Sequence, residues 1–197
     1  MTVPSKLDLK KREDKLKSFL KKLGPDGKPQ EKHVVSVVRS AIRSAWIKSD
    51  VKLAYLYMNT IPDMDDSTRT KWLTKCEICE GLFKLNEVQI DHKLGNHSFT
   101  KVEDFENYFN NILMVGFDDL QILCVECHEC KTLQEKQGLT WEEAKATKEA
   151  IRLQKAKLDT QWLKENGIIP ASNSAKRRVQ IVEKLMEEKE NERYGVE

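Results

Sequence analysis

The sequence predicts an α+β fold that is mostly helical, in which a small strand-containing unit lies between helical flanks. Two observations lead to this fold class. Apolar residues recur at helical spacing on both sides of residues 76–132, as in amphipathic helices. Inside that segment, the stretch GLFKLNEVQI at 81–90 shows the apolar alternation that is typical of strands. We therefore divide the chain into residues 1–75, 76–132 and 133–197.

The bulk composition is typical of a helix-rich intracellular protein. Charged residues make up 34% and hydrophobic residues 39% of the 197 residues, which is enough for a modest core. No apolar run reaches the roughly 18 residues of a membrane span, and the first residues lack the apolar segment of a secretory signal. We therefore expect a cytoplasmic protein without a membrane partner, whose five cysteines stay reduced.

The N-terminal region, residues 1–75, is predicted to be helical and basic. Residues 5–22 are rich in lysine and precede the helix-breaking stretch GPDGKP at 24–29. Residues 32–48 are predicted to form a second helix, and we assign its apolar stripe to the core. That stripe consists of Val34, Val38, Ile42, Ala45 and Trp46.

Charge is unevenly distributed along the chain. Residues 1–48 carry 13 Lys and Arg against 5 Asp and Glu, whereas residues 76–132 carry 4 against 11. Basic flanks beside an acidic centre indicate binding to a polyanion. A basic helix can also be simply a solvated surface, so this alternative stays open. The candidate anion contacts are residues 6–22, 32–48 and 176–178.

Two cysteine pairs indicate a zinc site. The motifs CEIC and CVEC both have C-x2-C spacing, and two such pairs in a reducing compartment are typical of tetrahedral zinc. Cys130 has the same spacing from Cys127, so the fourth ligand is either Cys124 or Cys130. We favour Cys124, because it ends the apolar stretch LQILC. Four thiolates leave no open coordination position, so this Zn²⁺ is predicted to be structural. The predicted ligands are Cys76, Cys79, Cys124 and Cys127.

A second group of metal-binding side chains follows the predicted strands. The alternation on both sides of Asn86-Glu87 predicts a β-hairpin, whose second strand runs into Asp91 and His92. Asp91 and His128 offer an oxygen and a nitrogen ligand to one divalent cation. Neighbouring strand residues point to opposite faces, which leaves His92 free to act as a general base. These groups suit phosphodiester hydrolysis.

The loop at 94–117 is rich in aromatic residues, which we assign to a small local core rather than to base stacking. These residues are Phe99, Phe105, Tyr108, Phe109 and Phe117. His97 lies in the same loop, and we assign it a structural or peripheral role.

The C-terminal region, residues 133–197, is predicted to be a helical extension. Thr140 and Glu143 have the spacing of a capping box. We expect one long helix from there to Asn166-Gly167, where the glycine ends it. A last helix is predicted at 175–188.

The motifs C-x2-C, VQIDHK and DDLQILCVECHECKT together resemble the HNH endonucleases, in particular the zinc-stapled kind common in phages and intron-encoded enzymes. The resemblance covers residues 76–132. It implies a ββα-metal unit, in which a hairpin and a helix surround one divalent ion, Mg²⁺ or Mn²⁺. Carried onto this chain, it makes His92 the general base, and Asp91 and His128 the ligands of that ion.

The chain departs from the family pattern at Asp119. The family usually has an asparagine directly before L-Q, which ties down the loop through hydrogen bonds. An ionised aspartate accepts hydrogen bonds but donates none, so Asp119 can take over only part of this role. Asn110 or Asn111 is an alternative for it.

Together these patterns predict a metal-dependent DNA endonuclease with a structural Zn²⁺ and a catalytic Mg²⁺ or Mn²⁺. The basic flanks would hold the DNA, because Lys and Arg supply most phosphate contacts. The alternative is a non-catalytic zinc-binding module for nucleic acid or protein, which leaves Asp91, His92 and His128 unexplained. The paired cysteine spacing disfavours a redox or disulfide protein. A monomer and a dimer, and a nick and a double-strand break, are all compatible with the sequence.

Overall fold

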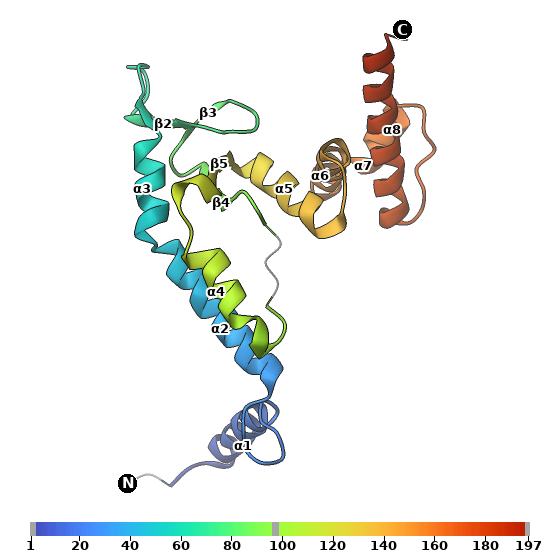
Figure 1. The fold of residues 1–197 in the computed structure, drawn as a ribbon. Coiled ribbons are helices and arrows are strands. Elements are labelled where there is room, and N and C mark those ends of the chain that lie inside the picture. Colours follow the sequence, from blue (N-terminus) through green and yellow to red (C-terminus); the bar gives the residue numbers. More distant parts are fainter. Residues whose placement is uncertain (1–2, 96–98, 196–197) are drawn as a thin grey trace. The chain divides into compact units, whose positions relative to one another are not determined.

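The computed structural model describes residues 3–95 and 99–195, which form two compact units. The first unit consists of Met1–Tyr55 and His97–Leu120, and the second of Leu56–Asn96 and Gln121–Glu197. Each unit therefore joins two stretches that are separated in the sequence. The architecture is α+β and mostly helical, as predicted (Figure 1).

The first unit is built on helices. Helix α1 spans Lys6–Leu20 and helix α2 spans Glu31–Ile47, close to the two predicted N-terminal helices. Every residue of α1 is exposed, and its N-terminus is closed by a capping box between Ser5 and Asp8. Helix α4, Phe105–Leu113, lies alongside α2 (Figure 1). The core that α2 and α4 share contains Val35, Ile42, Phe99 and Tyr108.

The aromatic segment forms a local core, as predicted, but much of it is helical rather than a loop. Short 3-10 turns at Val102–Asp104 and Phe117–Asp119 flank α4. The rings of Phe99 and Tyr108 stack with their centroids 5.2 Å apart. Phe105, Tyr108 and Phe109 recur at helical spacing, so the sequence did contain the signal for this helix.

The strands of the second unit form two small sheets. After helix α3 (Asp50–Met58), strands β1 (Thr60–Pro62), β2 (Trp72–Lys75) and β3 (Leu82–Lys84) form an antiparallel sheet in that order. Strand β4, Val88–His92, pairs with β5, Leu120–Cys124, in a separate sheet.

The predicted hairpin around Asn86-Glu87 is therefore wrong in its pairing. The turn exists, since the Glu87 N–H donates to the Lys84 carbonyl at 2.9 Å. The two strands then enter different sheets, because β3 pairs with β2 and β4 pairs with β5. Apolar alternation marks a strand and its buried face, but it does not specify the partner strand.

Helix α5, Val125–Gln137, begins directly after β5 and ends at Gly138, whose φ of 66° is left-handed. Such a residue is a common helix end. Helix α6, Trp141–Lys155, begins with the predicted capping box: Glu143 accepts from the Thr140 N–H at 2.7 Å. The last helix, α8, spans Ser174–Tyr194 and includes the predicted 175–188.

The single long helix predicted from Thr140 to Asn166-Gly167 is wrong. The chain breaks after α6, where Lys157 adopts a left-handed φ of 60° and the Leu158 N–H donates to the Leu153 carbonyl at 2.9 Å. Helix α7, Asp159–Glu165, follows this break. The break buries Asp159, which forms an ion pair of 2.7 Å with Arg177 of α8.

The helices α6, α7 and α8 pack around a core of their own. Its buried residues are Ala150, Leu153, Leu163 and Ile181. Among the described residues, none of the helices is both long and apolar enough to cross a membrane.

Candidate functional site

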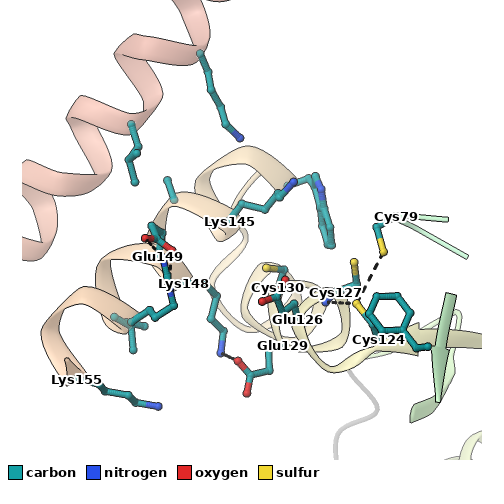
Figure 2. Close-up of a pocket in the computed structure, with 17 residues that line it drawn as sticks. Cys79, Cys124, Glu126, Cys127, Glu129, Cys130, Lys145, Lys148, Glu149 and Lys155 are labelled. Carbon is teal, nitrogen blue, oxygen red and sulfur yellow. Dashed lines mark hydrogen bonds and ion pairs between the residues drawn. The ribbon is translucent and has the colours of Figure 1, made fainter. Parts of the chain in front are cut away.

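The four predicted zinc ligands come together in the second unit. Their Sγ atoms all lie within 4.8 Å of one another, and those of Cys79 and Cys124 are 3.9 Å apart (Figure 2). Four sulfurs at about 2.3 Å from one tetrahedral Zn²⁺ would be about 3.8 Å apart. The cluster could therefore hold a metal ion such as zinc with little rearrangement.

Two hydrogen bonds between Glu77 and Ile122 join the segments that carry the two cysteine pairs. The Glu77 N–H donates to the Ile122 carbonyl at 2.8 Å, and the Ile122 N–H donates to the Glu77 carboxylate at 2.7 Å. These bonds tie the first pair to β5, which leads into the second pair. The Cys127 N–H donates to the Cys124 sulfur at 3.4 Å. The cysteine cluster thus links segments that are distant in the sequence.

The cysteine thiols differ in acidity. Burial raises the pKa of Cys124 and of Cys127. Burial also opposes ionisation of Cys76, but hydrogen bonds involving Cys124, Cys79 and Ile78 outweigh it and lower its pKa to about 7. A thiol must lose its proton to bind a metal. Metal binding here would therefore release protons.

The choice between Cys124 and Cys130 is decided by position. Cys124 ends β5 and belongs to the four-sulfur cluster, whereas Cys130 lies six residues later, within α5, and does not. Cys130 is buried, and its burial raises the pKa of its thiol. Of the two candidates for the fourth ligand, Cys124 is the one that lies in the four-sulfur cluster.

Asp91 and His128 face each other across β4 and α5. The Asp91 Oδ1 atom lies 3.8 Å from the His128 Nε2 atom, and the two side chains are 20% and 28% exposed. The start of α5 is fixed next to β4 by a hydrogen bond of 3.2 Å from the Val125 N–H to the Glu87 carbonyl. Two residues predicted as ligands of one divalent ion therefore lie close together.

Lys131 is the residue at this site that sequence reasoning missed. Its Nζ atom lies 2.9 Å from Asp91 Oδ2 and 2.9 Å from the His92 carbonyl, and it also contacts the Glu135 carboxylate. Burial opposes the charge of Lys131, but its bonds to Glu135 and Asp91 raise its pKa above the ordinary value. The signal was available, since residues 128, 131 and 135 share one face of a helix.

Gln121 of β5 completes the support of Asp91. Its Nε2 atom donates to Asp91 Oδ2 at 3.2 Å and to the His92 carbonyl at 3.4 Å. The Oδ2 atom thus receives bonds from Gln121 and Lys131, while Oδ1 points to His128. The carboxylate of Asp91 is therefore held in one orientation.

His92 lies at the end of β4, and its backbone is held by two side chains. Its carbonyl accepts from Lys131 and Gln121, and the residue is only 9% exposed. In β4 it alternates with Asp91 and shares a face with the buried Ile90. The prediction that Asp91 and His92 point to opposite faces agrees with this burial pattern.

Asp119, the residue in the place of the family's asparagine, accepts a hydrogen bond of 2.8 Å from the Gly116 N–H. This bond closes the turn at Phe117–Asp119. Asn110 and Asn111 both lie in α4, and Asn111 donates to Asn107 at 2.9 Å. His97 lies outside the described residues.

Several basic residues predicted as DNA contacts already have partners in the fold. Arg39 donates to the Phe99 carbonyl, and Arg43 donates to the Tyr108 hydroxyl at 3.2 Å. Arg177 is paired with Asp159, and Arg178 donates to Gln154 at 2.8 Å. The lysines of α1, in contrast, belong to a fully exposed helix.

Comparison with known proteins assigns no family to the chain. It matches no family model, no curated protein and no solved structure. The resemblance to HNH endonucleases therefore rests on the sequence motifs between residues 76 and 132.

Proposed function

We propose that this protein is a metal-dependent DNA endonuclease of the HNH type. The observation that carries the proposal is the approach of Asp91 Oδ1 to His128 Nε2, at 3.8 Å, beside a strand pair that leads directly into a helix. Carboxylate oxygen and imidazole nitrogen are common ligands of catalytic divalent ions. The order β4–β5–α5 would supply the two strands and the helix of a ββα-metal unit.

The spacing suits one small divalent ion. Neighbouring ligands at about 2.1 Å from an octahedral Mg²⁺ stand about 3 Å apart, so a shift of about 1 Å would bring both atoms into range. In the described part of the chain, only the cysteines form a group of three or more metal-binding side chains. Asp91 and His128 would thus leave several coordination positions for water and a phosphate oxygen, as metal-assisted hydrolysis requires.

His92 would act as the general base. A neutral imidazole takes a proton near physiological pH, and a positioned base of this kind activates the attacking water. Lys131 and Gln121 would act as positioning residues, because they hold the Asp91 carboxylate and the His92 backbone together. The cysteine cluster would hold a structural zinc ion.

The substrate contacts would come in part from α1. Its lysines are exposed, and Lys17 forms an ion pair with Glu13 of the same helix. We predict that deleting residues 1–30 weakens DNA binding and lowers its salt dependence, by about 0.9 in log–log slope for each duplex phosphate that α1 neutralises. Anisotropy titrations of the truncated and full-length chains at several salt concentrations would measure this. Equal affinity and slope would refute it.

The nuclease proposal is tested by nicking. The zinc-loaded protein is incubated with supercoiled plasmid and with phage DNA, with Mg²⁺ or Mn²⁺ and with an EDTA control. We expect metal-dependent nicking by the wild type and by Glu103→Gln, which removes an exposed carboxylate of the first unit. The Asp91→Asn variant should lose it. Intact DNA with the wild type under all conditions would overturn the proposal.

A non-catalytic zinc-binding module is the second candidate. The observation that favours it is the burial of His92, which is 9% exposed. A base must reach a water molecule at the substrate. Such a module would bind DNA in the anisotropy titrations but would leave the plasmid intact with any of the divalent ions.

A further inference from the structure

The second unit contains a pocket that neither metal site explains. It has a volume of about 750 Å³ and is lined by residues of α5, α6 and α8, with the cysteine cluster at one end (Figure 2). This volume lies in the range of ligand-binding pockets. Five basic residues line it, against the three carboxylates of Glu126, Glu129 and Glu149. The basic residues are Lys145, Lys148, Arg152, Lys155 and Lys189.

Four of the basic residues form a stripe along α6. They lie at 145, 148, 152 and 155, so they follow one another by 3, 4 and 3 residues on one face of the helix. At a rise of 1.5 Å per residue, the stripe is about 15 Å long. A linear array of this length can contact several groups of an extended anion in succession.

Two of these cations are already paired, and the others are not. Lys148 pairs with Glu129 at 3.0 Å and Arg152 with Glu149 at 2.6 Å. In the described part of the chain, Lys145, Lys155 and Lys189 have no carboxylate within ion-pair distance, and only Glu126 of the lining carboxylates is unpaired. The pocket therefore has an excess of positive charge that the fold leaves uncompensated.

Charge balance for the cysteine cluster does not account for this excess. Four thiolates around Zn²⁺ carry a net negative charge, which nearby lysines can offset. Lys155, however, lies at the end of the pocket away from Cys79 and Cys124 (Figure 2). Phe83 and Trp141, which also line the pocket, pack against the cysteine core. The end near Lys155 is thus left with exposed cations and no aromatic platform.

We propose that this pocket binds a single nucleic-acid strand through its phosphates. A duplex is too wide to enter a pocket of this size, whereas one phosphodiester backbone can follow the stripe along α6. Because the aromatic side chains are engaged in the core, binding depends on phosphate contacts and not on base stacking, so it is independent of sequence. The inference deepens the proposed nuclease by naming a strand-binding surface, but binding itself requires no cleavage.

The test compares two variants with equal charge. Lys145, Lys155 and Lys189 are replaced by Gln in the pocket variant, and Lys71, Lys157 and Lys164 in the control, which lie in the same unit but do not line the pocket. Binding of fluorescein-labelled dT12 to the full-length, zinc-loaded protein is followed by anisotropy at 50 to 300 mM KCl, without Mg²⁺. Far-UV circular dichroism melts check that both variants fold.

The pocket variant should bind more weakly, and its log–log salt slope should fall by about 2, since each single-strand phosphate that a lysine neutralises contributes about 0.7. The control should match the wild type. Equal slopes for both variants, or no binding by the wild type at 50 mM KCl, would overturn the proposal. So would displacement of dT12 by poly-glutamate at equal charge concentration, since the pocket would then accept acidic peptides.

Nicking assays separate this inference from the proposed function. If the wild type nicks DNA and the pocket variant binds dT12 as the control does, the pocket assignment fails and the nuclease stands. If the wild type binds dT12 with the expected slope but nicks no DNA, the nuclease fails and the pocket stands.

Discussion

The two faces of α5 carry sites of opposite character. Toward one side, Cys127 joins a cluster of four sulfurs, three of which belong to buried residues. Toward the other side, His128 and Lys131 meet Asp91 of β4 in a group of polar and charged side chains that are 12% to 28% exposed. A four-sulfur metal site is closed to substrate, whereas the ion that we propose at Asp91 and His128 would keep open coordination positions.

This difference teaches how neighbouring residues of one short motif can be directed into two separate groups of side chains. Cys127 and His128 are neighbours in sequence, but a helix rotates successive residues by about 100°, so they belong to different sites. The cysteine cluster fixes the start of α5, and that start places His128 opposite Asp91. A rigid support of this kind is what a precise site needs.

The largest effect is expected from breaking the cysteine cluster. Cys76→Ser should abolish metal binding there and unfold the second unit, because zinc binding contributes about 10–16 kcal/mol of folding free energy in comparable sites. Zinc content by mass spectrometry and thermal melts by circular dichroism would measure both effects.

Cys130→Ser is the matched control. This buried cysteine lies outside the cluster, so the variant should keep one zinc and lose only about 1 kcal/mol of stability for burying a hydroxyl. Loss of zinc from Cys130→Ser would show that the ligand set is different.

The open site is tested by His92→Ala. Removing a general base should lower the cleavage rate by about 10²- to 10⁴-fold, while zinc content and DNA affinity stay at wild-type values. Single-turnover cleavage of a DNA that the wild type cuts would give the rate. Wild-type cleavage by this variant would remove His92 from the chemistry.

A smaller effect is expected from Lys131→Met, measured by urea unfolding. The variant leaves the carboxylates of Asp91 and Glu135 without their shared cation. Because the site is partly exposed, we expect a loss of about 1–3 kcal/mol. The double variant Lys131→Met/Glu135→Gln should recover part of the lost free energy of unfolding. If the single and the double variant were equally stable, the ion pair between Lys131 and Glu135 would not be the cause of the loss.

The sign of the pH dependence follows from the raised pKa of Lys131. The folded state binds the lysine proton more tightly than the unfolded state, so the contribution is fully present below the unfolded pKa. It is lost only as the pH rises through the raised pKa, above the ordinary value of 10.5. The stability difference between the wild type and Lys131→Met should therefore be constant around neutral pH.

The smallest effect is expected at Gly95. A Cβ at this position would lie only 2.2 Å from a Glu135 carboxylate oxygen, so Glu135 must move away from Lys131. The end of a flexible side chain moves at low cost, so Gly95→Ala should lose about 1 kcal/mol. In a Glu135→Ala background the same substitution should be neutral, and urea unfolding of the four proteins forms the double-mutant cycle. If Gly95→Ala lowered the free energy of unfolding equally in the wild-type and Glu135→Ala backgrounds, the contact with Glu135 would not be the cause of the loss.

Much of the cysteine site could be predicted from the sequence. The two C-x2-C pairs identify their own ligands, and the apolar run before Cys124 distinguishes it from Cys130. The proximity of Asp91 and His128 also follows from a strand end and a helix start. These features are local, so short patterns carry them.

The parts that could not be predicted depend on distant segments. The residues on either side of Asn86-Glu87 look like one hairpin, but β5 lies about 30 residues further along the chain and pairs with β4. The break after α6 depends on a buried ion pair between Asp159 and Arg177. Such pairings compete with local preferences, and a single sequence does not show which partner wins.

The proposal of a second metal centre beside the cysteine cluster is tested most directly by titrating zinc-loaded protein with Mn²⁺ and following free Mn²⁺ by electron paramagnetic resonance. The wild type should bind one Mn²⁺ and retain one zinc. Asp91→Asn, which keeps the shape of the side chain but weakens it as a ligand, should lose the Mn²⁺ and retain the zinc. Equal Mn²⁺ binding by both proteins, or none by the wild type, would contradict a second metal centre at Asp91 and His128.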